Sequence, residues 1–377
     1  MSSGRIHILD EIEFAPGARA AFLAALEKHY RPAAEDIGLR LRSLWLDPAL
    51  EAEGVACRAL LDWELGEVAD FWAWRARGGA HPELVAFWAD AAPQIARRAR
   101  RYVREVGSLA PAGPERSGLA PGTARSASGD AAPERGLAQP RPGVRRTVAL
   151  IRLRAGAGDA ERAALERALA LQAERAPGVA AASLGRNLPG TLNGGDYTLE
   201  LGSHAAGAPG APARSEAPSA GALVAGLSAP LRALVAGLDE VALEPIAGGL
   251  REPGIGAAIK RTLLLRVLPE AASADVAAFE RALLAMPQHI AAIRNWSLSR
   301  VCAGSAPLGW THAWEQDFAD VSGLADDYMN HPVHWSLVDG WFHAEDPRCI
   351  VAPVLAHVFC GAQRSLLSHA FAPVPRS

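Results

Sequence analysis

The residue types best suited to chemistry gather late in the chain. Seven of the eleven histidines follow residue 253, and residues 327–342 read DYMNHPVHWSLVDGWF. Pro332 is expected to open a helix, because its ring blocks a preceding helical turn. His334 then lies in the first turn, where the helix dipole disfavours a positive charge and keeps the imidazole neutral near pH 7. Tyr328 and His331 precede that helix, so this segment offers a general base together with a phenol.

A second group of candidates lies on a strand predicted over residues 310–318. Alternation places one set of side chains on a single face: Trp310, His312, Trp314, Gln316 and Phe318. If that face lines a barrel, it forms a pocket of ring surfaces with few polar groups, the usual form of a small-molecule site. The expected partner is a small hydrophobic or aromatic molecule. Taken alone, a histidine on such a face is about as often a satisfied core residue as a functional one.

A metal site is another interpretation of the same histidines. His331 and His334 stand three positions apart, and with His312 they could supply three nitrogens. No carboxylate falls in an evident fourth position, so we expect no metal. Four other histidines of this region have no such neighbours and are interpreted as structural or exposed: His289, His343, His357 and His369.

The elements that must position these residues follow one plan three times. Each repeat has the pattern of a strand, a helix, two strands, a second helix and a closing strand, the ferredoxin-like β-α-β-β-α-β order. The opening strands are expected at 6–14, 146–153 and 261–268, the last two sharing an Arg-Thr start. Such a unit leaves one apolar sheet face bare, so it needs a second unit to cover it. The predicted class is therefore α+β, with the last two repeats closing a barrel within one chain.

Composition sets the domain boundaries. Residues 107–143 are rich in Pro, Gly, Ala and Ser without periodicity, and cannot bury enough apolar area to offset the entropy of ordering. They are predicted to be a flexible linker, and residues 204–220 a long surface loop. The domains then run over 1–106, 144–252 and 253–377.

Bulk properties exclude several classes of protein. The chain of 377 residues has a formal net charge of −3 and is 50% apolar, which gives no basic surface for nucleic acid. No basic start precedes an apolar run, and no stretch reaches the roughly 18 apolar residues of a membrane span. The four cysteines are scattered without a C-x-x-C pair, so neither disulfides nor a zinc ribbon are indicated. We expect a cytoplasmic protein, and the near absence of lysine indicates a high-GC bacterial genome.

The segment from Tyr328 to His334, Tyr-Met-Asn-His-Pro-Val-His, resembles the stress-responsive A/B barrel (Dabb) family of the dimeric α/β barrel superfamily. The resemblance covers roughly residues 258–361, and the repeat is most similar to plant members of the olivetolic acid cyclase type. These close a linear polyketide by aldol condensation without a cofactor, which implies catalytic roles for the tyrosine and the last histidine. The family's strand histidine maps to His312. Arg261 stands where a pocket-edge histidine is found, so the substrate is expected to differ.

The other two repeats resemble the same superfamily. In the middle repeat Leu199 replaces His312 and no His-Pro-x-His occurs, which implies a degenerate Dabb copy without a site of its own. The first repeat is similar to NIPSNAP-like members, with His81 before an amphipathic helix and Leu84 in the slot of His334. Because one repeat is left over, a homodimer is expected, in which the first repeat pairs with its copy.

Together these residues predict a cofactor-independent acid/base enzyme that acts on a small aromatic or ketide carbonyl compound through an enolate, as a cyclase, an aldol-type lyase or an isomerase. His334 would abstract a proton, Tyr328 would stabilise the oxyanion, and His312 would orient the substrate. Five further side chains are expected to contact the substrate: His331, Trp310, Trp314, Arg261 and Trp335. Two alternatives stay open: a cofactor-free or haem-dependent oxygenase with the same barrel, and a non-enzymatic small-molecule-binding or stress protein.

Overall fold

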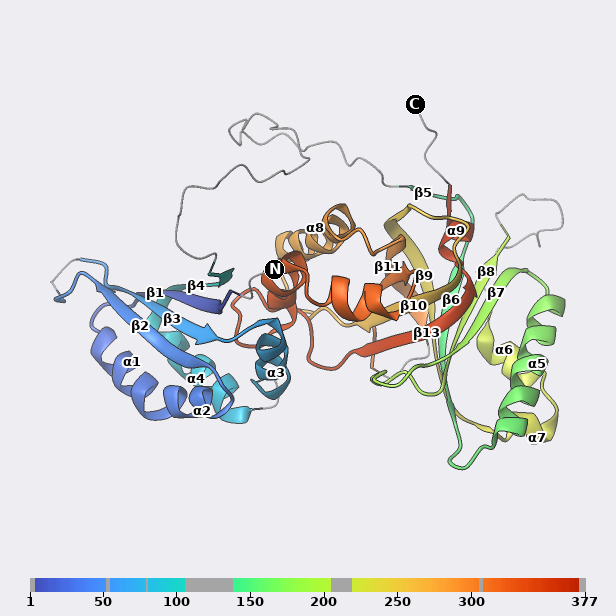
Figure 1. Cartoon of the computed structure of the whole chain (residues 1–377), viewed down its shortest axis with the longest axis horizontal. Helices are drawn as coiled ribbons and strands as arrows, with labels where there is room; N and C mark the ends of the chain where they lie inside the picture. Colours follow the sequence, from blue (N-terminus) through green and yellow to red (C-terminus); the bar gives the residue numbers. More distant parts are fainter. Residues whose placement is uncertain are drawn as a thin grey trace. The chain divides into compact units, whose positions relative to one another are not determined.

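The computed structural model of the chain describes residues 4–51, 55–78, 81–105, 138–204, 219–304 and 308–372. Contacts within the chain divide it into two compact units, Met1–Arg135 and Gly136–Ser377, which are considered separately (Figure 1). The expected linker over 107–143 lies outside the described residues up to position 137, as does most of the expected loop over 204–220. In the described part of the chain, no helix is long and apolar enough to cross a membrane.

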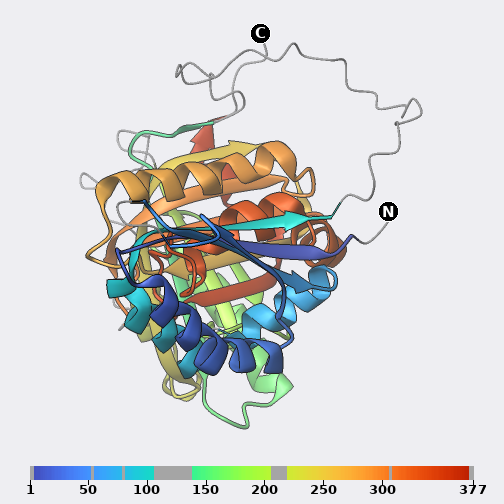
Figure 2. The ribbon, with the colours of Figure 1, turned by 90° about the vertical axis from the view of Figure 1, so that its left-hand side faces the viewer.

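The first unit has the strand and helix order expected of its repeat. Its antiparallel sheet has the strand order β2-β3-β1-β4, and its helices lie on one face of that sheet (Figure 1, Figure 2). The elements are, in chain order, β1 (Ile6–Phe14), α1 (Arg19–Ala25), η1 (Leu26–Tyr30), α2 (Arg31–Asp36), β2 (Arg40–Asp47), β3 (Arg58–Leu65), α3 (Val68–Gly78), α4 (Pro82–Ala91), η2 (Ala92–Gln94) and β4 (Ile95–Arg104).

Alternation along β1 builds the core of this unit. Ile6, Ile8 and Ile12 are fully buried on one face of the strand, as a half-buried strand requires. Asp10 shares that face and is also fully buried, so a carboxylate interrupts the apolar row. A buried charge needs partners, and β4 supplies them from the neighbouring strand.

The second unit contains the other two repeats and confirms the predicted α+β class. The middle repeat comprises β6 (Arg146–Leu153), α5 (Asp159–Arg175), β7 (Val179–Arg186), β8 (Tyr197–Ser203), α6 (Ala220–Ala225), α7 (Ala229–Arg232) and β9 (Val235–Leu250). The third comprises β10 (Gly256–Leu265), α8 (Ser273–His289), β11 (Asn295–Gly304), β12 (His312–Phe318), η3 (Gly323–Tyr328), η4 (Val333–Val338), η5 (Asp339–Phe342) and β13 (Ala356–Arg364). Beside them lie β5 (Gln139–Pro140), α9 (Leu367–Ala370) and β14 (Phe371–Ala372), of which β5 and β14 pair.

These two repeats share one sheet that closes on itself. Its eight strands run β13-β10-β12-β11-β9-β6-β8-β7, and the junction between the repeats is the antiparallel pair of β9 and β11. The two ends of this order meet, because Asn187 bridges Cys360 and Leu192 bridges His357. α8 lies against one part of the sheet and α5 against another (Figure 1). The last two repeats therefore form a barrel within one chain, as predicted.

The two faces of this sheet bury different residues. Trp314 and Phe318 of β12 pack with Phe279 of α8 in one apolar cluster, which is the layer between helices and sheet. Ala313 of the same strand instead packs with residues of β6 and β9, such as Val148, inside the barrel. The expectation that the aromatic face of this strand lines the barrel is therefore wrong, since that face is covered by helices.

Two further details of register differ from the sequence prediction. Trp310 precedes β12 and joins the cluster inside the barrel, so it does not share the face of His312. The Arg-Thr starts of the two repeats also do not superpose. Arg146 binds Glu315 inside the barrel, whereas Arg261 binds Gln316 in the helix layer. A shift of one residue sends equivalent side chains to opposite faces of a strand.

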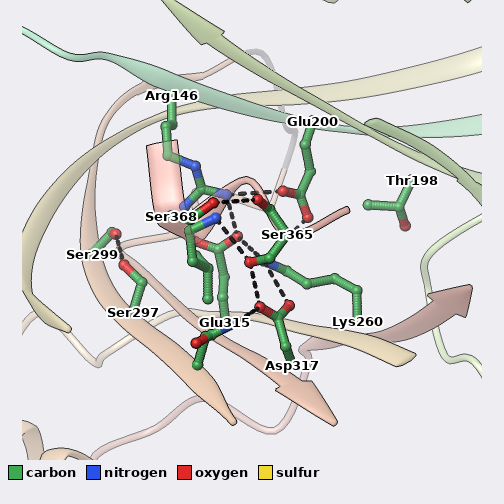
Figure 3. A network of polar contacts seen from close by, with 12 residues as sticks. Arg146, Thr198, Glu200, Lys260, Ser297, Ser299, Glu315, Asp317, Ser365 and Ser368 are labelled. Carbon is green, nitrogen blue, oxygen red and sulfur yellow. Dashed lines mark hydrogen bonds and ion pairs between the residues drawn. The ribbon is translucent and has the colours of Figure 1, made fainter. Parts of the chain in front are cut away.

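The interior of the barrel holds a network of buried charges (Figure 3). Nη1 of Arg146 lies 2.6 Å from Oε2 of Glu315, and Nη2 lies 3.0 Å from Oε2 of Glu200. Nζ of Lys260 lies 3.2 Å from Glu315, 3.3 Å from Glu200 and 3.9 Å from Asp317. Burial disfavours the Glu315 anion, but the two cations outweigh it and lower the pKa of Glu315 to about 2. Both repeats contribute charges, so the network joins the two halves of the barrel.

Candidate active site

Tyr328 and His334 stand on two neighbouring π-helical segments. Tyr328 ends η3, His334 is the second residue of η4, and Pro332 precedes η4 as predicted. The centres of their rings are 4.3 Å apart, and the ring planes are inclined by 36°. Turns of π-helix are rare in proteins, and those that do occur are often found at functional sites. The structure therefore brings the predicted phenol and base together, with Tyr328 fully buried and His334 partly exposed.

Arg261 of β10 lies against this pair. Its guanidinium carbon is 5.1 Å from the centre of the Tyr328 ring. Its Nε donates to Nε2 of His357 at 2.8 Å, and its Nη1 donates to Oε1 of Gln316 at 2.7 Å. Burial lowers the pKa of Arg261, whose exposed fraction is 4%. Among the described residues no carboxylate is recorded to bind it, although buried charges are ordinarily paired.

Hydrogen-bond donors outnumber acceptors around Tyr328. The indole Nε1 of Trp314 and the amide Nε2 of Gln316 are buried, and both act as donors toward the Tyr328 hydroxyl without forming a hydrogen bond of full geometry. The orientation of the Gln316 amide is fixed, because its oxygen accepts from Arg261. Nη2 of Arg261 likewise makes no recorded hydrogen bond. Buried donors without acceptors are costly, so this layer is suited to receive an oxygen that carries negative charge.

Burial and the charge of Arg261 set the ionisation of the group. Burial raises the pKa of Tyr328, and Arg261, Trp314 and Gln316 oppose that rise. Burial, with the Arg261 charge acting in the same direction, lowers the pKa of His334 to about 3. The same two causes lower the pKa of His357 to about 2. Both imidazoles are therefore neutral at pH 7, and for His334 the main cause is burial rather than the helix dipole.

His312 faces α8. Its Nδ1 lies 2.8 Å from Oγ1 of Thr311, and its Nε2 lies 3.3 Å from Oε1 of Glu280. The ring of Phe279 stands edge-on to it at 6.2 Å. Burial lowers the pKa of His312, and Glu280 acts against that change. Among the described residues, its recorded contacts include neither Tyr328 nor His334, so it lies further along the same strand face.

The other predicted contacts are distributed around the pair. His331 accepts a hydrogen bond from the backbone of Val333 and is partly exposed. Trp335 is fully buried and donates its indole N–H to the carbonyl oxygen of Asn330 at 3.3 Å. Trp310 lies inside the barrel. The described residues contain no group of three or more His, Cys, Asp or Glu side chains that could hold a metal ion.

Sequence reasoning missed the role of His357. It stands on β13 opposite Leu263 of β10 and accepts a hydrogen bond from Arg261, so it directly contacts a residue of the site. The sequence gives little sign of this contact. His357 reaches Arg261 only because β13 pairs with β10, and α8, β11 and β12 separate these two strands in the chain. Gln316 was correctly grouped with Trp314 on one strand face, but its bond to Arg261 was not foreseen.

The expected pocket of aromatic rings is filled largely by those rings. The ring centres of Phe318 and Tyr328 are 5.6 Å apart, and Trp314 is fully buried beside them. A groove of about 970 Å³ lies instead between α5 and β7 of the middle repeat, and the end of β13 also lines it. Beside the buried Tyr328, His334 is the partly exposed member of the pair.

Comparison with known proteins identifies this part of the chain. Residues 259–351 match the model of the Stress responsive A/B Barrel Domain (Dabb). The chain carries a Dabb domain. The match lies within the predicted limits of the resemblance, and it contains Arg261, His312, Tyr328 and His334 of the site. No curated protein matches the chain.

Three solved structures illustrate what parts of the chain are similar to. A NIPSNAP domain protein from Burkholderia xenovorans is 17% identical, covers 28% of this chain and 99% of its own, and has a TM-score of 0.24. An anthrone oxidase-like protein is 10% identical over 58% of this chain and 91% of its own, with a TM-score of 0.41. A mutant chlorite dismutase from Candidatus Nitrospira defluvii is 8% identical over 61% of this chain and 93% of its own, with a TM-score of 0.38.

Proposed function

We propose that the Dabb domain is a cofactor-independent acid/base enzyme that removes a proton beside a carbonyl group and holds the resulting enolate. The observation that carries this proposal is the excess of buried donors around Tyr328, from Arg261, Trp314 and Gln316. An enolate oxygen gives these donors a stronger acceptor than the neutral Tyr328 hydroxyl. Donors that are already in place and dehydrated stabilise charge developing on an oxygen without reorganising.

His334 is the general base of this proposal. Its imidazole is neutral, is partly exposed and packs on Tyr328, so it can receive a proton from a molecule bound against the phenol. A pKa of about 3 makes it a weak base in the empty site. The charge of Arg261 contributes to that low pKa, so an enolate that neutralises Arg261 raises the basicity of His334 when the proton is transferred.

Tyr328 and His312 take supporting roles. The phenol of Tyr328 is neutral at pH 7, because burial raises its pKa, and it can donate to the enolate oxygen. His312, held by Glu280, orients the distal part of the substrate along the same strand face. The substrate is a small aromatic or ketide carbonyl compound, since the surrounding surfaces are ring faces. Cyclisation, aldol-type cleavage and isomerisation all pass through this enolate.

Deuterium exchange tests the shared step directly. Aryl methyl ketones and aryl β-diketones are incubated in D2O with the full-length protein, and loss of the α-proton signal is followed by NMR. The wild type is expected to accelerate exchange, and His334→Ala to reduce that acceleration by about 100-fold. His29→Ala, which removes an exposed histidine of the first unit, is the matched control and leaves the rate unchanged.

Three outcomes would reject the proposal. One is a wild-type rate equal to the buffer rate for the whole ketone panel, and another is an unchanged rate in His334→Ala. The third is saturable ketone binding, seen by quenching of tryptophan fluorescence, without exchange, which supports a non-enzymatic binding protein. Oxygen uptake with a hydroquinone, in place of exchange, supports the oxygenase alternative.

We also propose that the first unit pairs with its copy in a second chain. Trp45 of β2 is 51% exposed and stands opposite Leu60 of β3, on the sheet face that the helices leave bare. Leu9 of β1 lies on that face too, opposite Asp62 and diagonal to Leu60, so apolar side chains stand among charged ones there. Sedimentation equilibrium is expected to give a dimer for the wild type and a shift toward monomer for Trp45→Glu. A monomeric wild type at all concentrations contradicts the pairing.

A further inference from the structure

The first unit holds a second buried basic group, apart from the Dabb domain. Asp10 of β1 is bound by two arginines of β4, whose side chains stand two positions apart on the helix-facing side of the sheet. Oδ1 of Asp10 accepts from Arg98 at 2.9 Å and from Arg100 at 2.8 Å. Its Oδ2 accepts from Arg100 at 2.8 Å. One carboxylate is therefore shared between two guanidinium groups.

The sharing is unequal. Arg100 meets Asp10 side by side, with Nε and Nη2 donating to different oxygens of the carboxylate. Arg98 reaches only Oδ1, through Nε at 3.2 Å and Nη2 at 2.9 Å. The hydrogen bonds recorded for Arg98 among the described residues all go to Asp10, and none involves its Nη1. The end of the Arg98 guanidinium that carries Nη1 and the second Nη2 hydrogen is thus available.

Trp88 of α4 fixes the plane of that guanidinium. The carbon atom of the Arg98 guanidinium lies 3.2 Å from the centre of the Trp88 ring, close enough for the two planar groups to stack. The side chain of Arg98 is 9% exposed, and its Nη1 makes no recorded hydrogen bond among the described residues. A guanidinium held flat by an aromatic ring and a carboxylate presents its free edge in one orientation.

Electrostatics favours an anion at this edge. Burial lowers the pKa of Arg98, and the neighbouring Arg100 lowers it further, while Asp10 acts against both. Burial would raise the pKa of Asp10, but Arg100 and Arg98 outweigh it and keep the carboxylate ionised. A second carboxylate at the free edge of Arg98 would receive two parallel N–H bonds, the strongest geometry for this pair.

We propose that the first unit binds a small carboxylate ligand through the free edge of Arg98, on the platform formed by Trp88 and Asp10. The carboxylate meets Nη1 and Nη2 side by side, and an aromatic or aliphatic body extends away from the sheet edge. This site uses no residue of the Dabb domain. It gives the first unit a ligand-binding function distinct from pairing between chains.

Titration calorimetry on the full-length protein tests the site, with sodium benzoate, sodium acetate and sodium sulfate as probes at constant ionic strength. Saturable binding of benzoate or acetate is expected in the wild type. Arg98→Gln should weaken it by about tenfold or more, since a charge-assisted bidentate contact is lost. Arg98→Lys keeps the charge without the planar fork and should weaken binding nearly as much.

Two controls separate this site from general charge effects. Arg97→Gln removes an arginine from the opposite face of the same strand, where it pairs with Glu11, and should leave binding unchanged. Arg261→Gln alters the Dabb domain and should also leave it unchanged. The fold is expected to survive Arg98→Gln because Arg100 keeps both bonds to Asp10, and circular dichroism checks this.

Each remaining outcome counts against the proposal. Absence of saturable carboxylate binding in the wild type overturns it. Equal affinity of Arg98→Gln and wild type places the ligand elsewhere. Equal loss in Arg97→Gln shows that net charge, not the Arg98 edge, governs binding. Binding of sulfate alone, with no affinity for either carboxylate, replaces the carboxylate class with a tetrahedral oxyanion.

Discussion

The ring of His334 packs on the ring of Tyr328 at a centroid distance of 4.3 Å, in a layer that also contains the buried guanidinium of Arg261. A neutral base, a neutral acid and a fixed positive charge thus share one small volume. Such an arrangement separates the tasks of taking a proton and of holding the electron pair that remains.

Tyr328→Phe isolates the hydroxyl group. The phenylalanine ring keeps the contacts with His334 and Phe318, so the melting temperature should change little. Loss of one donor to the enolate should lower the deuterium-exchange rate by about 100-fold. NMR exchange assays and thermal unfolding of the same preparation measure both effects, and an unaltered exchange rate would remove the phenol from the mechanism.

Arg261→Gln should affect both catalysis and the ionisation of its neighbours. Removal of the positive charge should raise the pKa of His334, because Arg261 contributes to its low value. The exchange rate should nevertheless fall, by about 100-fold, since the enolate loses its counter-ion. Histidine ring signals followed by NMR over a pH series report the pKa. A variant with an unchanged His334 titration would show that burial alone sets it.

The wild-type titration itself is a separate prediction. The pKa values of His334 and His357, about 3 and about 2, lie below the value of 6.5 for a free imidazole. Their ring signals should not move between pH 8 and pH 5. Because the unfolded chain takes up protons below about pH 6.5 and the folded chain does not, stability should fall as the pH drops from there toward 3. His334→Gln should weaken that fall, and an equal slope would contradict the low pKa.

Lys260→Met tests the charge network inside the barrel. The variant leaves Glu315 and Glu200 with Arg146 as their remaining cation, and should lose about 3–5 kcal/mol of unfolding free energy. Lys28→Met, which replaces the exposed lysine of η1, is the matched control and should be neutral. Calorimetry on the whole chain measures both. Equal melting curves for the two variants would mean that the network adds nothing to stability.

Gly185→Ala tests closure of the barrel. A Cβ atom at Gly185 of β7 would lie 2.6 Å from the carbonyl oxygen of Gly361, across the line where β7 meets β13. The overlap should cost about 1–3 kcal/mol. Gly361→Ala makes the same chemical change on the facing strand, where the added atom meets nothing within 4 Å, and should cost little. A similar loss in both variants would argue against a closed junction in solution.

The sequence predicted the elements better than their orientation. The strands at 6–14 and 146–153 were predicted at the bounds that the structure has, because each is flanked by clear breaks. The third opening strand, predicted over 261–268, runs instead over Gly256–Leu265. Alternation assigns residues to two faces but does not say which face the helices cover. Trp314 and Gln316 were therefore placed together correctly and assigned to the wrong side of the sheet.

The candidate site was predicted in part for a similar reason. Tyr328 and His334 are six positions apart, so local structure alone brings them together. Arg261 and His357 meet only through the pairing of β10 with β13, which depends on the whole fold. The charge network was missed because Glu315 and Asp317 alternate with Trp314, Gln316 and Phe318, a pattern that resembles the exposed face of a half-buried strand.

Closure of the barrel within one polypeptide has a consequence for how such a protein can change. When two identical chains form a barrel, every substitution occurs twice, once in each half. Here β9 joins β11 inside a single chain, so each half can vary without its counterpart. The third repeat has Tyr328, His334 and Arg261. The middle repeat has Leu199, an apolar residue packed in its own layer between helices and sheet, where the third repeat has His312. One half can therefore serve as a scaffold while the other carries the site.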